Sequence, residues 1–194
     1  MHPVPDGFAP PPLSADDERG IDDIVAFWRG APDAWFDKDP AFDAAFRDRF
    51  LHRHMAVAAR HHDGWIAAPK GALALILLTD QFPRNAFRGT GHMYATDPLA
   101  RLYARQAHEA GYMPSFETDL RVFLCLPFAH SEDMADQHLS VELNRRLGDP
   151  WLEHAEGHRD IIRRFGRFPH RNHLLGRATT PDEADFLAAG GFAG

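Results

Sequence analysis

Apolar residues recur at helical spacing along almost the whole chain, and proline or glycine separates one such segment from the next. Phe42, Phe46 and Phe50 lie four residues apart after Asp39-Pro40, a pairing of N-cap residue and first-turn proline that begins a helix. No segment shows the alternation of apolar and polar residues, or the enrichment in β-branched residues, that a strand needs. The pattern predicts an all-α protein, and the short connections predict that its helices stack as antiparallel pairs.

The other helices can be placed from the same signals. Gly71 to Leu78 is apolar on all sides and follows Pro69, so it is predicted to be the most buried helix and to end before Pro83. Each remaining helix has an apolar stripe and a recognisable start or stop. These helices are predicted at Leu99–Ala110, at a stripe from Phe116 that Pro127 ends, after a cap at Ser131, at Trp151–Phe165, and from Thr180-Pro181 onward.

The length of 194 residues fits one domain that can bury a core without a metal ion or a disulfide. Hydrophobic residues make up 44% of the chain and charged residues 25%, as in an ordinary globular protein. Residues 1–12 instead contain five prolines, a composition that favours an extended arm. We therefore expect an arm over residues 1–19 and a single all-helical domain over residues 20–194.

The formal net charge of -7 disfavours nucleic acid as a partner, because it removes the general attraction to phosphate. The longest apolar run, Gly71 to Leu78, is far shorter than the roughly 20 residues of a membrane-spanning helix. The first residues hold no apolar signal core, and the single cysteine, Cys125, lies in an apolar run where burial is expected. We expect a cytoplasmic protein with neither nucleic-acid nor membrane partners.

Polar residues that could carry chemistry occur in three places. Asp80 directly follows the apolar helix, where a partly desolvated carboxylate requires a cation, and Arg84 is the nearest one. His130 and Glu132 follow the apolar segment 120–128 in the same way. Between residues 158 and 177, six arginines stand against one acidic residue, which gives a local charge of +5 in a chain of negative net charge.

Two interpretations of these motifs stay open. In the first, the arginines neutralise the carboxylates in a partly buried network that fixes how helices meet, as structural ion pairs often do. In the second, some guanidinium groups face a cleft and bind an anion through two parallel hydrogen bonds. The charged residues concerned are Arg84, Arg167, Arg171, Asp80, Glu132 and Asp133.

Two of the motifs echo each other in sequence. Phe82-Pro-Arg-Asn85 is similar to Phe168-Pro-His-Arg-Asn172, and each follows the end of a predicted helix. The simplest interpretation is a pair of helix-terminating turns, in which proline prevents continuation and asparagine satisfies free backbone groups. That interpretation leaves the arginine in each motif unexplained.

The 13 histidines raise the question of a metal site. His154 and His158 lie four residues apart on one predicted helix, so their imidazoles could share a face. The spacing is only permissive, because the chain contains neither Glu-x-x-His nor His-Glu-x-x-His. His158 also lies on the apolar stripe of its helix, where a histidine is more often a hydrogen-bonded core residue. We expect neither a metal nor a cofactor.

The sequence does not decide whether the protein is an enzyme. It contains no Gly-x-Ser-x-Gly motif, no Gly-x-x-x-x-Gly-Lys phosphate loop and no Gly-x-Gly-x-x-Gly dinucleotide motif. An acid–base enzyme that uses His130, Glu132 or His158 stays open, although no spacing defines its geometry.

Three longer motifs are more specific. Leu77–Asn85, Leu126–Asp133 and Arg164–Asn172 resemble the motifs of the bacterial domain-of-unknown-function family 924, as does Leu175–Glu183. The resemblance implies a tetratricopeptide-like right-handed superhelix of paired helices, with no assigned biochemical activity. Because no 34-residue tetratricopeptide period is legible, peptide binding in a concave groove is an analogy of fold only.

The leading hypothesis is a protein that binds a small anionic ligand, of carboxylate or phosphate type, in a pocket lined by arginine, histidine and asparagine. The alternative is a tetratricopeptide-like module that binds a protein or peptide partner without catalytic activity, which would need a contiguous exposed apolar groove. The predicted ligand-binding residues are Asp80, Arg84, Asn85, His130, Glu132, His158, Arg167, His170, Arg171 and Asn172.

Overall fold

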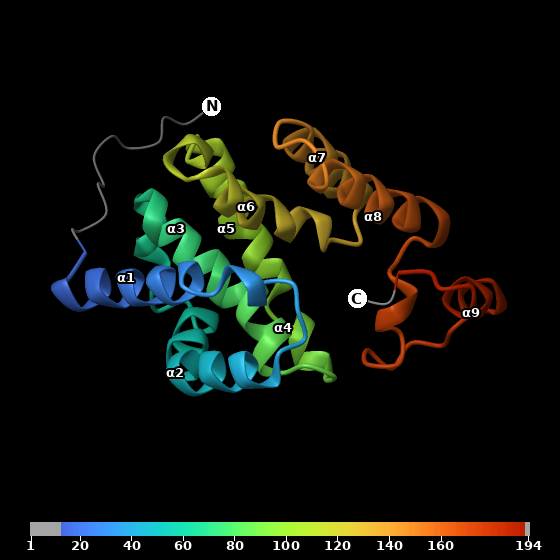
Figure 1. Cartoon of the computed structure of the whole chain (residues 1–194), viewed down its shortest axis with the longest axis horizontal. Helices are drawn as coiled ribbons and strands as arrows, with labels where there is room; N and C mark the ends of the chain where they lie inside the picture. The colour runs from blue at the N-terminus through green and yellow to red at the C-terminus, as the bar shows by residue number, and fades with distance from the viewer. Residues whose placement is uncertain (1–12, 193–194) are drawn as a thin grey trace, which may run out of the picture.

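The structure, a computed structural model that describes residues 13–192, contains helices and turns and no strand in that range (Figure 1). This confirms the predicted all-α class. Residues 1–12 of the proline-rich arm lie outside the described residues. Helix α1 (Ala15–Arg29) begins with a capping box between Ser14 and Asp17. Residues 15–19, which the composition assigns to the extended arm, are therefore helical.

Helix α2 (Pro40–Ala58) buries the predicted phenylalanine stripe against α1. Asp39 caps its first turn through its carboxylate. Phe42 and Phe46 are buried, and their ring centroids lie 5.9 and 5.4 Å from that of Trp28 in α1. Aromatic burial of this kind is the largest contribution that single side chains make to a core. The prediction of this helix is confirmed.

The central helix does not end before Pro83, as predicted, but continues through it. Helix α3 (Pro69–Ile76) passes without a break into a π-helical turn, η3 (Leu77–Gln81), and then into α4 (Phe82–Ala86). All residues of η3 and those of α3 from Gly71 onward are buried. This confirms that the helix occupies the centre of the core.

The helix survives Pro83 because side chains satisfy carbonyl groups that the π-helical turn and the missing proline N–H leave free. Three side chains donate hydrogen bonds to these carbonyl oxygens; two come from distant parts of the chain and one from the next turn of the helix. They are His54 Nδ1, the Thr96 hydroxyl and Arg84 Nη1, which lie 2.8, 2.6 and 2.7 Å from the carbonyl oxygens of Leu78, Thr79 and Asp80, respectively. Turns of the π type are frequent at functional sites, and this one directs Asp80 into the core.

The chain continues through α5 (Asp97–Glu109), α6 (Thr118–Ala129), α7 (Met134–Arg145) and α8 (Trp151–Phe165). Two predicted boundaries in this region are wrong. Pro127 does not end its helix but lies in the last turn of α6, where it removes one ladder hydrogen bond and leaves the rest intact. The N-cap of α7 is Asp133 and not Ser131, because the helix begins two residues later than predicted. The Ser131 hydroxyl instead donates to the Asp136 carboxylate.

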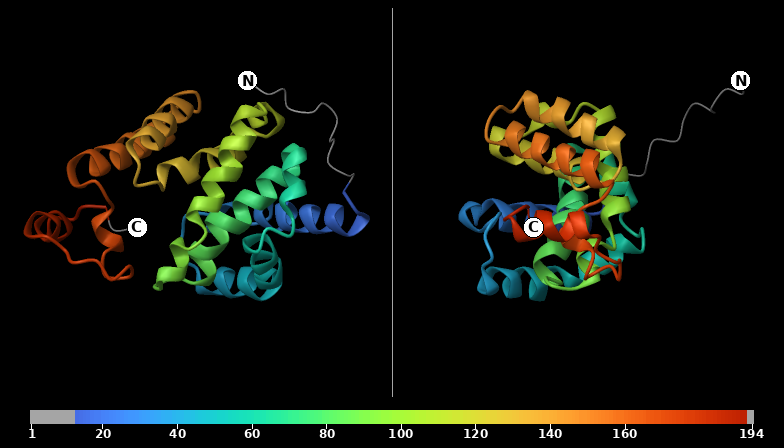
Figure 2. Two further views of the ribbon diagram at one scale, coloured as in Figure 1. Left: turned by 180° about the vertical axis from the view of Figure 1, so that it is seen from behind. Right: turned by 90° about the vertical axis from the view of Figure 1, so that its right-hand side faces the viewer.

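The described chain ends with a 3₁₀ turn, η6 (Pro169–Arg171), and α9 (Pro181–Ala188). Gly166 ends α8 in the left-handed conformation, with φ at 70°, and Thr180 begins α9 with a capping box. Both boundaries confirm the prediction. Figures 1 and 2 show α1 and α2 at one end of the molecule and α9 at the other, with α7 and α8 side by side before it.

The apolar core has two parts. The larger part is built from side chains of the segments from α1 through α6 and from Leu143 of α7. The smaller consists of Ile161, Ile162 and Phe168, against which α9 packs through Phe186. Asp80 and its polar partners Gln81, Arg84 and His130 belong to neither apolar part. Within residues 13–192, no helix combines the length and the apolar character needed to cross a bilayer.

Candidate functional site

The carboxylate of Asp80 lies in the core, where the π-helical turn places it. The residue is 0% exposed, and its oxygens accept hydrogen bonds from Gln81 Nε2 over 2.6 Å and from His130 Nδ1 over 2.8 Å. Arg84 Nη1 lies 3.2 Å from the oxygen that His130 contacts. Burial alone would raise the pKa of Asp80, but Arg84 and His130 lower it to about 2, so the carboxylate is ionised.

Arg84 joins Asp80 to a second carboxylate, that of Asp97 at the start of α5. Its Nη1 and Nη2 donate to the two oxygens of Asp97 over 2.9 and 3.1 Å, the paired arrangement in which arginine binds carboxylates most strongly. Burial would lower the pKa of Arg84, but the two carboxylates raise it above its ordinary value. Arg84 is therefore a charged group with two partners, in a position that holds α4 to α5.

Arg171 approaches Asp97 from the C-terminal part of the chain. It is 6% exposed, and its Nη1 lies 3.5 Å from Asp97 Oδ2, farther than either nitrogen of Arg84. Its guanidinium group lies between the rings of Tyr94 and Phe168, whose centroids are 4.6 and 4.5 Å from Cζ. Among the described residues its buried Nε has no hydrogen-bond partner. Burial and the charge of Arg84 lower the pKa of Arg171, so this cation is less well neutralised than Arg84.

Three histidines complete the imidazole–arginine cluster, which we define as His130, His158, His170 and Arg171. The rings of His130 and His158 are 6.5 Å apart, and the Phe168 ring lies 5.5 Å from His158 and 5.7 Å from His170. In the described part of the chain, Nδ1 of His158 and Nδ1 of His170 are buried without a partner. Burial and neighbouring cationic groups lower the pKa of His158 to about 3 and that of His170 to about 4, so both rings are neutral at pH 7.

A second polar network lies beside this cluster, and its charges are paired. Arg177 donates to the two oxygens of Glu132 over 2.7 and 3.0 Å. Arg167 donates to the two oxygens of Glu183 over 2.6 and 2.8 Å, which lowers the pKa of Glu183 to about 2. Asn172 joins the two pairs, because its amide donates to Glu183 and accepts from Arg177. The network holds the segment around η6 to the start of α9.

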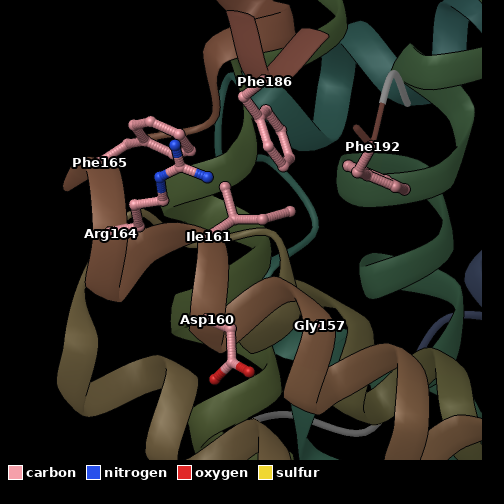
Figure 3. A pocket seen from close by; sticks show the side chains of 7 residues that line it. All are labelled: Gly157, Asp160, Ile161, Arg164, Phe165, Phe186 and Phe192. Atoms are coloured by element: carbon pink, nitrogen blue, oxygen red, sulfur yellow. The ribbon is translucent and has the colours of Figure 1, made fainter. Parts of the chain in front are cut away.

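A hollow of about 370 Å³ lies between α8 and α9 (Figure 3). Its lining is mostly apolar and consists of Gly157, Asp160, Ile161, Arg164, Phe165, Phe186 and Phe192. A smaller hollow of about 20 Å³ lies between α6 and α8 and reaches His158. The Phe192 ring borders the larger hollow and packs edge-on against His158 and His170, at centroid distances of 4.7 and 5.1 Å. Phe192 thus lies between that hollow and the imidazole–arginine cluster.

A family model for a bacterial protein of unknown function (DUF924) matches residues 24–191. The chain belongs to the DUF924 family. A solved structure of a protein of unknown function from Agrobacterium tumefaciens, ATU0120, is 55% identical in sequence to this DUF924 member and has a TM-score of 0.88. The similarity covers 90% of this chain and 99% of that one. No curated protein matches the chain.

In this DUF924 member, the three sequence motifs that resemble the family meet in space. Asp80 and Arg84 come from the first motif, His130 from the second and Arg171 from the third, and Asp97 contacts two of them. The structure brings together Asp80, Arg84, His130, His158, His170 and Arg171, with Glu132, Arg167 and Asn172 in the adjacent network. Asn85 lies apart, where its amide donates to Asp43 over 2.7 Å. A role in ligand binding stays a prediction for all ten residues.

The ion pairs differ from those that the sequence suggests. Arg167 pairs with Glu183 and with neither Glu132 nor Asp133. Glu132 is taken by Arg177 instead. Asp133 caps α7 through its carboxylate, which accepts from the backbone of the first turn. Arg167 is therefore part of the structural pairing around α9.

Three residues of the site have no signal in the sequence that marks them. Asp97 precedes a proline and looks like an ordinary helix-start residue, yet it is the shared partner of Arg84 and Arg171. Tyr94 and Phe192 come from short segments without a motif. Only the unexplained arginine in each echoing motif pointed to an acid such as Asp97, since two buried cations require a negative partner.

The histidines do not converge on a metal-binding arrangement in the described part of the chain. Within residues 13–192, no group of three or more His, Cys, Asp or Glu side chains is placed to hold a metal ion. His158, which shares a face of the predicted helix with His154, has a buried Nδ1 without a hydrogen-bond partner among the described residues. Its ring packs edge-on against those of Phe168 and Phe192.

Proposed function

We propose that this protein binds a small anionic ligand, of carboxylate or phosphate type, at the imidazole–arginine cluster. The supporting observation is the distribution of buried side-chain atoms that lack a hydrogen-bond partner. Six such atoms occur in residues 13–192, and three of them, Arg171 Nε, His158 Nδ1 and His170 Nδ1, belong to this cluster. Because buried polar groups are nearly always paired, a concentration of unpaired nitrogens at one place is typical of a site completed by a ligand or ordered water.

The chemistry of the unpaired nitrogens favours an anion. Arg171 Nε is a donor, and arginine recognises the oxygens of carboxylate and phosphate groups. Each neutral imidazole can carry its proton on Nδ1 and donate as well. The acid that Arg171 contacts, Asp97, already accepts two hydrogen bonds from Arg84. Arg171 reaches Asp97 through Nη1 only, over 3.5 Å, and an anion would supply the acceptor that its Nε lacks.

Phe192 marks the route by which a ligand would reach the cluster. Its side chain is 43% exposed and packs against the rings of His158 and His170. It belongs to the last described residues of the chain, after Gly190, which has a φ of 80°. Displacement of this one ring would uncover both imidazoles from the side of the larger hollow.

Isothermal titration calorimetry with inorganic phosphate tests this proposal. We expect the wild type to bind one phosphate and Arg171→Lys to bind it at least tenfold more weakly, because lysine keeps the charge but lacks Nε. Arg163→Lys is the matched control, since Arg163 is an exposed arginine of α8 that pairs with Asp160. Phosphate should raise the Tm of the wild type and the control. No binding by the wild type, or equal binding by Arg171→Lys, contradicts the proposal.

A tetratricopeptide-like interaction module without catalytic activity is the alternative. Such a module would present a contiguous exposed apolar groove. The large apolar side chains that are exposed among the described residues are Phe36, Leu51, Met55, Leu102, Leu175 and Phe192. Leu51 and Met55 lie one turn apart on α2, and the other four come from separate segments. Their spread over several elements favours the anion-binding proposal over a groove for a peptide.

A further inference from the structure

Asp80 determines which nitrogen of His130 carries the proton. The ionised Asp80 carboxylate is an acceptor only, so the nitrogen that faces it over 2.8 Å, Nδ1, must donate. Burial and the charge of Arg84 lower the pKa of His130 by more than the Asp80 carboxylate raises it, so the ring stays neutral at pH 7. A neutral imidazole with its proton on Nδ1 has a lone pair on Nε2. His130 therefore presents an acceptor on the side of the ring opposite Asp80.

His130 cannot readily reverse this arrangement. Asp80 is held by Gln81 and Arg84 in addition to His130, and it lies in a buried turn of the central helix. A proton moved to Nε2 would set the Nδ1 lone pair against a buried carboxylate oxygen, and a ring flip would replace the Nδ1–H donor with a C–H group. Either change takes a donor from that oxygen, which costs as much as an unsatisfied buried group. The lone pair on Nε2 is thus a fixed feature of the site.

The same nitrogen is open to a ligand. Nε2 of His130 has no partner among the described residues, and it is not one of their fully buried unpaired atoms. The side chain is 17% exposed, and its ring lies 6.5 Å from that of His158. The imidazole–arginine cluster therefore combines a donor that cannot become an acceptor, Arg171 Nε, with an acceptor that is held as one, His130 Nε2.

We propose that His130 makes this site selective for anions that carry a hydroxyl group, such as hydrogen phosphate or a hydroxycarboxylate, over anions whose oxygens are all acceptors, such as sulfate or acetate. This inference rests on the proposed anion binding and adds the class of ligand. The charged oxygens of the ligand accept from Arg171 and the imidazoles of His158 and His170, while its O–H donates to His130 Nε2. An anion without a hydroxyl group would set an oxygen lone pair against the nitrogen lone pair, and a site built around a ligand O–H rejects analogues that lack it.

Calorimetric titrations at pH 7.5 with two matched pairs of anions test the selectivity. Phosphate and sulfate have similar size and shape, but only phosphate retains an O–H at this pH. Glycolate and acetate differ in the same way by one hydroxyl group. We expect at least tenfold tighter binding of the hydroxyl-bearing member in the pair that the site accepts. The pair with the higher affinity then distinguishes a phosphate-type from a carboxylate-type ligand.

A variant of His130 tests whether this residue causes the preference for anions that carry a hydroxyl group. The amide of His130→Gln can still donate to Asp80 but holds no fixed lone pair at the position of Nε2. We expect the preference for the hydroxyl-bearing anion to fall to about twofold or less. The affinity for the other anion of the pair, which has no hydroxyl group, should not fall. His154→Gln, which changes an exposed histidine of α8, is the control and should keep the preference of the wild type.

Nitrogen-15 NMR of the wild-type imidazoles gives an independent readout that does not need a variant to fold. At pH 7.5 the His130 signals should report a proton on Nδ1 and none on Nε2. A proton on Nε2, or equal affinity for both members of each pair, overturns the selectivity while anion binding itself stands. If none of the four anions binds, the anion site fails and the selectivity with it.

Discussion

Arg84 and Arg171 contact the same carboxylate, that of Asp97. Arg84 donates to it over 2.9 and 3.1 Å, and Arg171 lies 3.5 Å away. The two arginines come from the echoing motifs Phe82–Asn85 and Phe168–Asn172, which the sequence suggests are two helix-terminating turns. That interpretation is wrong for the first motif, because it forms α4 in the continued helix, whereas the second forms η6. The echo therefore corresponds to a helix and a turn that converge on one acid. One carboxylate shared by two cations fastens η6 to α4 and α5, and it also leaves Arg171 with too few acceptors.

Asp97→Asn should destabilise the protein strongly. We expect the free energy of unfolding to fall by about 3–5 kcal/mol, because Arg84 would lose its paired contacts and Arg171 its acidic neighbour while both stay buried. Urea unfolding followed by circular dichroism measures the change. Asp160→Asn removes an exposed acid that contacts two arginines, and it should cost less than about 1 kcal/mol. Similar losses in the two variants would show that Asp97 is not a shared buried partner.

Thr96→Val tests how the central helix passes Pro83. The Thr96 hydroxyl donates to the carbonyl oxygen of Thr79 over 2.6 Å in a buried place, and valine of nearly the same shape would leave that oxygen unpaired. We expect a loss of about 1–3 kcal/mol in the free energy of unfolding. In Thr90→Val an exposed hydroxyl that donates to Phe87 over 2.8 Å is lost, with an expected change below about 0.5 kcal/mol. If both variants lose the same amount, the π-helical turn does not depend on Thr96.

The buried neutral histidines make stability depend on pH in a defined direction. The pKa values of His158 and His170, about 3 and about 4, lie below the ordinary value of 6.5. The unfolded chain therefore binds protons that the folded protein does not, and stability that is fully present above pH 6.5 is lost as the pH falls toward 4 and then 3. Each histidine contributes a slope of at most about 1.4 kcal/mol per pH unit.

Urea unfolding at pH 7, 6 and 5 measures that slope. His158→Gln and His170→Gln should each flatten it, because glutamine has no proton to take up. His52→Gln, at an exposed position of α2, should leave it unchanged. A slope in His158→Gln as steep as that of the wild type would contradict the assignment of a neutral buried ring.

Phe192→Ala should ease access to the imidazole–arginine cluster. The ring covers His158 and His170 but is 43% exposed, so its removal should raise the association rate of phosphate severalfold and cost about 1 kcal/mol or less in stability. Phe36, which is 54% exposed and lies outside the cluster, gives the control variant Phe36→Ala. Rates that are the same in the wild type and Phe192→Ala would exclude Phe192 as the cover of the site.

The sequence predicts the helices well where apolar burial decides them and less well where distant side chains do. The stripe of Phe42 and Phe46 needs no tertiary information, because its period defines a buried face. The stretch from Gly71 to Leu78 needs none either, because a helix that is apolar on all sides has to be buried. The helix ends predicted at Pro83 and Pro127 are wrong, since a proline removes one backbone hydrogen bond of the helix and the helix can continue without it. Near Pro83, the carbonyl oxygens of the helix accept hydrogen bonds from His54 and Thr96. These residues are distant in sequence, so local sequence patterns do not reveal the contacts.

The same distinction applies to the candidate site. Asp80 and His130 can be proposed from the sequence because each follows an apolar helix, where a charged or polar group requires a partner. Asp97 cannot be proposed in this way, since its role depends on the two segments, α4 and η6, whose arginines meet at its carboxylate. Asn85 shows the converse, because it shares a motif with Arg84 but binds Asp43 on another side of the helix.

The central claim is that Arg171, His158 and His170 share an anion. Titration of nitrogen-15-labelled protein with inorganic phosphate observes the Arg171 Nε–H group and the imidazole nitrogens directly by NMR. We expect these signals to shift together, to saturate with one dissociation constant, and to lose that response in Arg171→Lys. Phosphate shifts that leave these nitrogens unchanged, or that spread over surface arginines without saturating, would contradict an anion site in the imidazole–arginine cluster.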